Sequence, residues 1–221
     1  MKSLKNIIIY IYNLIYIFRF KLLTEGNNII ECKGKIFGLK INIKGGKNRI
    51  KINGKVALNK KTTISIVGND NIIVFDEGSS VSEGCRIRIE GNNNKLVIGE
   101  RTSLVNVFFS MGDNNTDIEI GKDCLFSADV AFRNWDNHSI VMADMPDKRI
   151  CKGKSIFVED HVWIGNGVTV LKGVRIGHDS IIGTMSVVPA DVPSNSVAVG
   201  NPARVVKNGV SWNVKWLESC V

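Results

Sequence analysis

Three histidines are present in the sequence, His138, His161 and His178, and only His138 lies outside a regular repeat. A histidine on a loop is a natural general base, because an imidazole exchanges protons near neutral pH and can activate a hydroxyl group. Asp136 precedes His138 by two residues and is placed to orient the imidazole or to face an acceptor. We therefore expect catalysis around His138; the alternative is a solvated loop histidine without a role.

The element that must position this loop is a six-residue repeat in the C-terminal half. Aliphatic residues recur at every sixth position, and a small or β-branched residue follows each of them four positions later. The aliphatic series is Val158, Ile164, Val170, Ile176, Ile182 and Val188. Each hexad predicts a short strand and a turn, and three hexads form a triangular coil that is stable only when stacked on its neighbours. The pattern predicts a parallel β-helix.

The N-terminal half repeats with a longer period. Tracts rich in Gly and Asn begin at Gly26, Gly46, Gly68, Gly91 and Gly112, with spacings of 20, 22, 23 and 21 residues. Gly and Asn tolerate the left-handed backbone conformation that tight turns need. This looser period also fits a right-handed β-helix, and short strands with regular turns fit a β-sandwich. The strict hexad register downstream favours a left-handed parallel β-helix, an all-β fold.

The repeat is interrupted once, between Arg133 and Ser155. A long loop that leaves a regular scaffold is usually functional, and this one contains His138. We therefore divide the chain into an N-terminal hydrophobic and basic helix over 1–24, a β-helix domain over 25–207 with an excursion loop over 133–154, and a C-terminal capping tail over 208–221.

The N-terminal helix is expected because residues 7–18 are almost entirely apolar and have basic residues on both sides. The run is short for a membrane span and lacks the small-residue cleavage site of a signal peptide. We expect it to pack on the end of the β-helix or on a neighbouring subunit. A peripheral contact with anionic lipid is the alternative.

Composition narrows the function classes. The formal net charge is +8, but the lysines are scattered and no nucleic-acid-binding motif accompanies them, so we expect no nucleic-acid partner. The positive charge is compatible with a solvated basic surface or with binding to an acidic glycan, anionic lipid or a phosphorylated cofactor. The five cysteines include no CxxC pair, which argues against a disulfide framework or a zinc knuckle and favours a cytoplasmic location, with the inner membrane surface as an alternative.

Several tracts resemble a known family. They are His161–Gly165 (HVWIG), Val170–Gly177, Ser180–Gly183 and Gly200–Lys207, together with the tract Arg133-x-x-Asp136-x-His138-Ser-Ile. Over about residues 133–207 the chain resembles the hexapeptide-repeat O-acetyltransferases, and most closely the branch that includes the polysialic acid and galactoside acetyltransferases. The resemblance implies acetyl transfer from acetyl-CoA to a sugar hydroxyl of a bacterial surface polysaccharide, such as a capsule or O-antigen, or of its precursor.

The resemblance also implies roles for individual residues. His138 matches the catalytic base, and Trp163 matches a tryptophan that lines the donor channel near the thioester. Acetyl-CoA is expected between two β-helices of a homotrimer, and the matching donor contacts are Gly165, Gly183, Thr184, Arg204 and Lys207. Thr184 departs from the Ala or Gly usual there. Basic side chains at 204 and 207 suit nucleotide phosphates on charge grounds alone.

The acceptor side is less well defined by the resemblance. Arg133 belongs to the matching loop tract, and Asn106 lies one coil before it, in a place to face the acceptor. Trp135 stands where the branch more often has Ser or Thr, so the acceptor pocket is expected to have its own shape.

Three other functions are weighed. One is acetylation of an amino group on a nucleotide-linked sugar. Another is a zinc hydratase, which needs three converging histidines; the histidine pair four residues apart that is typical of those enzymes is absent, so we expect no metal. The third is a scaffold without catalysis.

Overall fold

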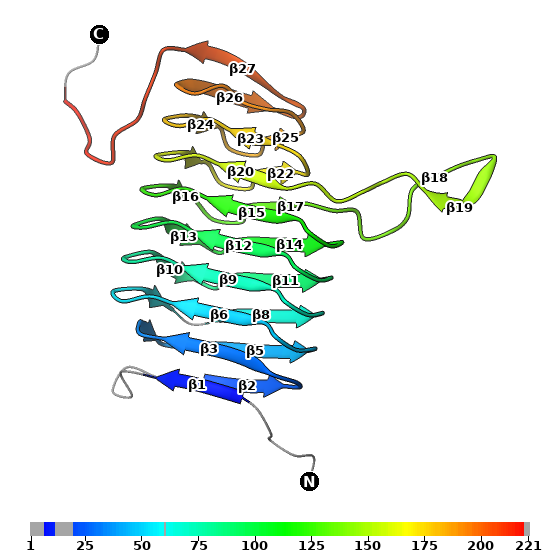
Figure 1. Ribbon diagram of the computed structural model, residues 1–221. Coiled ribbons are helices and arrows are strands. Elements are labelled where there is room, and N and C mark those ends of the chain that lie inside the picture. Colours follow the sequence, from blue (N-terminus) through cyan, green and yellow to red (C-terminus); the bar gives the residue numbers. More distant parts are fainter. Residues whose placement is uncertain (1–6, 12–19, 60, 219–221) are drawn as a thin grey trace.

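The computed structural model describes residues 7–11, 20–59 and 61–218, and none of these residues is helical. They form a parallel β-solenoid with three long sheets, here called sheets A, B and C, and one separate two-stranded hairpin (Figure 1). From residue 28 onward the chain visits the sheets in the order A, B, C in each coil. We call the edges between them the A–B, B–C and C–A corners. No helix that could span a membrane is found in this part of the chain.

Each sheet stacks strands from successive coils. Sheet A contains β1 (Ile7–Ile11), β3 (Asn28–Cys32), β6 (Arg49–Ile52), β9 (Ile72–Phe75), β12 (Lys95–Ile98), β15 (Asp117–Ile120), β20 (Ile156–Val158) and β23 (Arg175–Ile176). Sheet B contains β4 (Lys35–Ile36), β7 (Ala57–Leu58), β10 (Ser80–Glu83), β13 (Ser103–Val105), β16 (Leu125–Phe126), β21 (Trp163–Ile164), β24 (Ile181–Ile182), β26 (Ser196–Gly200) and β27 (Ala203–Asn208). Sheet C contains β2 (Phe20–Thr24), β5 (Leu39–Lys44), β8 (Thr62–Val67), β11 (Arg86–Glu90), β14 (Phe108–Gly112), β17 (Ala131–Arg133), β22 (Thr169–Leu171) and β25 (Val187–Val188).

The aliphatic side chains of the hexads point into the solenoid, as the sequence period predicts. The six members from Val158 to Val188 are each at most 4% exposed. Equivalent positions pair between neighbouring coils, Ile164 with Ile182 and Val170 with Val188. Such in-register stacking buries a continuous apolar column, and no single coil could bury its hydrophobic face alone. The predicted parallel repeat is confirmed.

The longer N-terminal coils are closed at the C–A corner by a ladder of buried asparagines. The Nδ2 of Asn48 donates to Asn28 Oδ1 at 2.9 Å, and Asn71 donates to Asn48 in the same way at 2.9 Å. Asn94 continues the column by donating its backbone N–H to Asn71 Oδ1 at 3.0 Å. Buried amides are costly unless they are hydrogen-bonded, and each one here binds its neighbours in the stack. The Gly and Asn tracts of the sequence are therefore the turns of this corner.

The helix predicted over 1–24 is wrong for the part of that segment that the structure describes. Residues Ile7–Ile11 form β1 and Phe20–Thr24 form β2, and they pair in parallel with β3 and β5. An unbroken apolar run fits a helix or a buried strand equally, and its β-branched Ile content favours the strand where an open sheet edge offers hydrogen bonds. Residues 12–19, which hold most of the run assigned to a packing or lipid contact, lie outside the described residues.

Two segments leave the regular coil. The excursion departs at the C–A corner, between β17 and β20, and folds into an antiparallel hairpin of β18 (Val141–Met142) and β19 (Met145–Arg149). The hairpin projects sideways from the stack (Figure 1). At the C-terminal end, β27 pairs antiparallel with β26, and the tail that follows turns back alongside the last coils.

Candidate active site

His138 lies at the foot of the hairpin and is exposed to solvent. Its backbone carbonyl accepts a hydrogen bond from Cys151 Sγ at 3.7 Å, and the N–H of Ile140 donates to the same sulfur at 3.0 Å. Its imidazole has no hydrogen-bond or ion-pair partner among the described residues. The backbone is thus fixed while both ring nitrogens stay available to a substrate.

Asp136 does not contact His138. Its carboxylate forms an ion pair with Lys172, which follows β22 on the next coil. The lysine ammonium attracts the carboxylate electrostatically, and this pairing holds Asp136 against the next coil. The structure therefore supports Asp136 as an anchor of the excursion, and its predicted orienting contact is not made within this chain.

The entry of the excursion is fixed by buried side chains. Asn134 is fully buried; its Nδ2 donates to Thr116 Oγ1 at 3.0 Å, and its Oδ1 accepts from Gly112 N–H at 3.0 Å. Trp135 donates from Nε1 to Ser110 Oγ at 3.2 Å, and its ring lies so close to Gly112 that a Cβ there would come within 2.0 Å. Trp135 is thus partly used in packing, and Gly112 is required beneath it.

The return of the excursion is fixed by Asp113. This carboxylate accepts from Gly153 N–H at 2.6 Å and forms an ion pair with Arg149 at 2.7 Å. Burial acts to raise the pKa of Asp113, but the hydrogen bonds from Gly153 and Arg149 outweigh it and lower the pKa. The charged form is therefore the one that holds the hairpin against the C–A corner.

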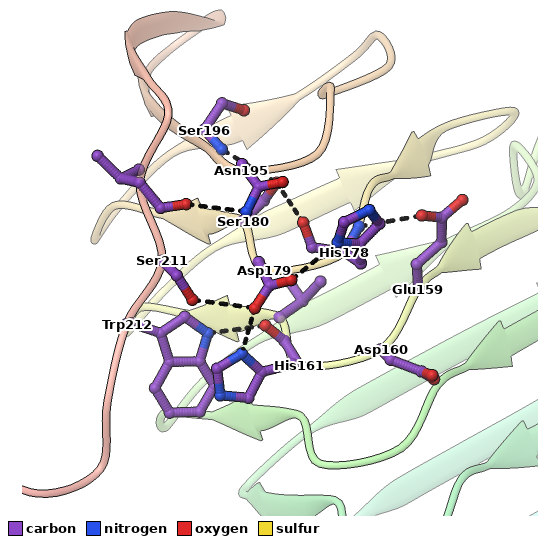
Figure 2. A network of polar contacts seen from close by, with 12 residues as sticks. Glu159, Asp160, His161, His178, Asp179, Ser180, Asn195, Ser196, Ser211 and Trp212 are labelled. Carbon is purple, nitrogen blue, oxygen red and sulfur yellow. Dashed lines mark hydrogen bonds and ion pairs between the residues drawn. The ribbon is translucent and has the colours of Figure 1, made fainter.

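Trp163 lies on the outer face of sheet B, on β21, and 39% of it is exposed. The tail contributes a second indole beside it, since the ring centres of Trp163 and Trp212 are 6.1 Å apart and the planes are tilted by 49°. Trp212 also stacks on His161 at 4.3 Å and donates from Nε1 to the His161 carbonyl at 2.7 Å. The stack of His161 and Trp212 (Figure 2) and the contact with Trp163 form an aromatic cluster at the A–B corner.

A carboxylate of the next coil contacts this cluster. Asp179 meets the Nδ1 of His161 at 2.7 Å and the Nδ1 of His178 at 2.8 Å, and it accepts from Ser211 Oγ at 2.9 Å (Figure 2). These bonds, first that of His178 and then that of His161, lower the pKa of Asp179 to about 2. His161 and His178 lie on neighbouring coils, 17 residues apart in the sequence, whereas nothing in the sequence indicates the contacts of the tail.

Metal binding has no evident donor set in the described residues. His161 and His178 both face Asp179, while His138 lies on the excursion at a different corner. No group of three or more His, Cys, Asp or Glu side chains that could hold a metal ion is found in this part of the chain.

The residues assigned to the donor lie along sheet B and the B–C corner. Gly165 and Gly183 begin successive turns of this corner, and Cβ atoms there would come within 2.8 Å of Thr184 N and 2.6 Å of Val199 Cγ1, respectively. Both glycines are therefore needed for close stacking of the coils, whatever they bind. Thr184 is exposed at the same corner.

Three further predicted site residues, Arg204, Lys207 and Asn106, lie on sheet B or at the B–C corner. Arg204 and Lys207 are exposed on β27, at the C-terminal end of sheet B. Asn106 lies lower on the B–C corner, with φ +47°, and donates from Nδ2 to Asp129 Oδ1. All these positions share one side of the solenoid.

One chain therefore carries two separated halves of the predicted site. The catalytic loop, with Arg133, Trp135, Asp136 and His138, lies at the C–A corner, whereas the donor residues lie on sheet B and at the B–C corner. Sheet C separates the B–C corner from the excursion. The structure brings together the members of each half but does not bring His138 to Trp163.

Comparison with known proteins agrees with this architecture. Residues 155–190 match the profile of the family described as bacterial transferase hexapeptide (six repeats). Among solved structures, the polySia-specific acetyltransferase NeuO superposes with a TM-score of 0.81 and 29% identity, covering 89% of this chain and 89% of NeuO. The resemblance to hexapeptide-repeat acetyltransferases expected from the sequence is confirmed.

Two curated relatives are similar over part of their length. The polysialic acid O-acetyltransferase of Escherichia coli O1:K1 / APEC is 33% identical over 114 residues, 52% of this chain and 36% of that protein. The galactoside O-acetyltransferase of Lactococcus lactis subsp. lactis (strain IL1403) is 39% identical over 92 residues, 42% of this chain and 44% of that protein. The chain thus spans less than half the length of either relative.

Proposed function

We propose that this chain is an acetyl-CoA-dependent O-acetyltransferase that modifies a sugar hydroxyl of a bacterial surface polysaccharide or its precursor, with His138 as general base. The observation that carries the proposal is the free, solvent-exposed imidazole of His138 on an excursion whose two ends are fixed to the solenoid. The similarity to proteins named polysialic acid and galactoside O-acetyltransferases supports the reaction class.

The proposed reaction is acetyl transfer from a thioester to a hydroxyl group, with His138 as the general base. His138 accepts the proton of the acceptor hydroxyl as its oxygen attacks the acetyl carbonyl of acetyl-CoA, giving a tetrahedral oxyanion. Collapse of this intermediate breaks the C–S bond and releases CoA, whose sulfur receives the proton from the imidazolium. Trp163 lines the thioester end of the donor channel in this proposal, and Gly165, Gly183 and Thr184 contact its pantetheine arm.

The nucleotide end of acetyl-CoA is assigned to Arg204 and Lys207. Both side chains are exposed, and Arg204 donates only to the carbonyl of Ala203 within the described part of the chain. Charged donors of this kind form strong hydrogen bonds with phosphate oxygens. On the acceptor side, Asn106, Arg133 and Trp135 are the proposed contacts, and Asp136 acts through Lys172 to hold the loop.

We further propose a left-handed solenoid and a homotrimer in which the site forms between copies. The separation of His138 from Trp163 in one chain supports this, since the excursion of one copy can reach sheet B of the next. The hairpin also exposes four large apolar side chains, Ile140 53%, Met142 45%, Met145 43% and Ile150 50%. Exposed apolar clusters of this kind are typical of protein interfaces.

We propose a cytoplasmic location because the described cysteines are free thiols and the proposed donor is acetyl-CoA. Cys32, Cys85, Cys124 and Cys151 are free and buried, which suits a reducing compartment. The alternative within this proposal is a peripheral contact of residues 7–18 with the inner membrane surface.

The test compares His138→Ala with Asn137→Ala, a matched change at the adjacent exposed position. Acetyl transfer from acetyl-CoA is measured by free-thiol release and by mass spectrometry of capsular, O-antigen and simple sugar acceptors. Loss of a general base costs about 10²- to 10⁴-fold, so His138→Ala should lose that much turnover while Asn137→Ala stays near wild type. Near wild-type turnover in His138→Ala, or acetyl groups found only on amino nitrogens, would contradict the proposal.

A further inference from the structure

A groove of about 790 Å³ lies along the B–C corner of the N-terminal coils. It begins at Phe37, passes Lys61 and Arg86, and ends at Asn106, the residue proposed for the acceptor side. These residues come from four successive coils, so the groove spans three inter-strand steps, or about 14 Å at about 4.8 Å each. That length suits several linked sugars better than one.

The lining of the groove has the chemistry of a glycan site. Hydroxyl and amide side chains (Asn59, Thr63, Ser82 and Asn106) offer hydrogen bonds to sugar hydroxyls, and Phe37 provides an apolar ring face. Cys85 also borders the groove, but its side chain is buried in the core and burial raises the pKa of its thiol to about 12, so it supplies no nucleophile. Nothing in the lining suggests a reaction, only binding.

The charge of the groove is positive. Lys61 and Arg86 are exposed, and neither forms an ion pair in the described chain, while Glu83 is the single acidic member of the lining. The backbone of Lys61 packs closely against Gly84 of the next coil, since a Cβ at Gly84 would come within 2.9 Å of the Lys61 carbonyl oxygen. Two unpaired cations against one carboxylate favour an anionic ligand.

A basic path links the groove to the catalytic excursion across sheet C. The guanidinium of Arg86 lies 4.4 Å from the ring centre of Phe108, and that of Arg133 lies 5.5 Å from the same ring. Arg133 is the last residue of β17, immediately before the excursion that carries His138. An extended ligand in the groove therefore has continuous cationic contacts leading toward the proposed base.

We propose that this groove binds a carboxylate-bearing polysaccharide strand, with Lys61 and Arg86 reading its charge and Phe37 contacting a sugar face. The proposal rests on the proposed function and deepens it: the acceptor is an acidic polymer rather than a single precursor sugar. Arg86 and Arg133 then guide the strand from the B–C corner to the loop where transfer occurs.

The experiment measures binding alone, with the full chain and without acetyl-CoA. Fluorescently labelled polysialic acid, hyaluronan and dextran of matched length serve as two carboxylated probes and one neutral probe. The Lys61→Gln/Arg86→Gln double variant is compared with Arg49→Gln/Lys51→Gln, which removes the same charge from the outer face of sheet A. Circular dichroism confirms that both variants keep the solenoid.

Wild type should bind at least one carboxylated polymer more tightly than dextran, and more weakly as salt is raised. The groove variant should lose about tenfold in affinity, or about 1.4 kcal/mol for two exposed cations, whereas the sheet A variant should lose less than about twofold. Equal losses in both variants, equal binding of dextran, or no binding of either carboxylated polymer would each overturn the groove proposal.

Parallel transfer assays separate this inference from the proposed function. If the groove variant binds the polymer normally while wild type acetylates a glycan, the groove assignment fails and the acetyltransferase stands. If the groove binds acidic polymer but wild type transfers acetyl to no glycan, the groove stands and the proposed function fails.

Discussion

The imidazole of His138 is free, while Asp136 in the excursion and Asp113 at the C–A corner are engaged elsewhere. Asp136 pairs with Lys172, and Asp113 pairs with Arg149 and Gly153 N–H. The sequence predicted His138 from its residue type and from the break in the repeat. The partner of Asp136 could not be predicted, because it depends on which side chain the next coil places beneath the loop.

Asp179 offers a residue-scale test by pH. Its pKa is lowered to about 2 in the folded protein by the bonds of His178 and His161, against about 3.9 in an unfolded chain. A depressed carboxyl pKa contributes stability that is full above the unfolded value and is lost as pH falls through the folded one. Its contribution should therefore be complete at neutral pH and fade between about pH 4 and pH 2.

We expect Asp179→Asn to lower the free energy of unfolding at pH 7 by on the order of 1 kcal/mol, a value reduced for partial solvent exposure. Urea denaturation of wild type and variant, repeated at descending pH, should show the two curves converging below about pH 4. A difference that stays constant down to about pH 2 would mean that the carboxylate charge does not stabilise the fold.

Elements differ in how fully the sequence specified them. The hexads after Ser155 were predictable because one residue type recurs at one spacing, and a slip would turn the aliphatic column outward. The N-terminal run was misassigned because an apolar stretch carries no period that separates a strand from a buried helix. The hairpin β18–β19 was predicted only as a loop, since its outer residues bury nothing in this chain.

The asparagine ladder at the C–A corner provides the element-scale prediction. Asn71 is fully buried, donates to Asn48 Oδ1 at 2.9 Å and to the Gly91 carbonyl at 2.9 Å, and accepts from Asn94 N–H at 3.0 Å. Replacing it by Ala leaves the Gly91 carbonyl and the Asn94 N–H without these partners, while Asn48 Oδ1 keeps the backbone N–H of residue 71 at 3.0 Å. We expect Asn71→Ala to cost about 2–4 kcal/mol, because each unsatisfied buried group costs about 1–3 kcal/mol.

The matched control is Asn92→Ala in the parallel, solvent-exposed column, where Asn92 Nδ2 donates to Asn114 Oδ1 at 3.1 Å. Water can replace that bond, so the cost should be below about 1 kcal/mol. Denaturant midpoints of both variants measure the difference. Equal destabilisation would show that burial does not set the value of the ladder.

At the scale of the whole molecule, the solenoid holds the two halves of the proposed site apart on one chain. The residues proposed for the donor follow sheet B and the B–C corner, and the loop proposed for catalysis leaves from the C–A corner. The six-residue period of the sequence predicted the solenoid, and the interruption of that period predicted the excursion loop. The separation of the two halves could not be predicted from the sequence, because the corner that each residue occupies depends on the geometry of the coils.

We propose that the site forms between two subunits, and subunit complementation is the most direct test of this arrangement. His138→Ala and Trp163→Ala are each expected to be nearly inactive. Co-expressed with different affinity tags and purified through both, they should form mixed assemblies in which some sites take the loop from one variant and the indole from the other. In a mixed trimer of either composition one of the three sites would be intact, or about a third of the sites.

Acetyl-transfer activity of the mixed sample is the measurement. We predict recovery to about a third of wild-type turnover, far above either variant alone. A mixed assembly no more active than the separate variants would place His138 and Trp163 in the same chain's site, or in no common site, and would contradict the account.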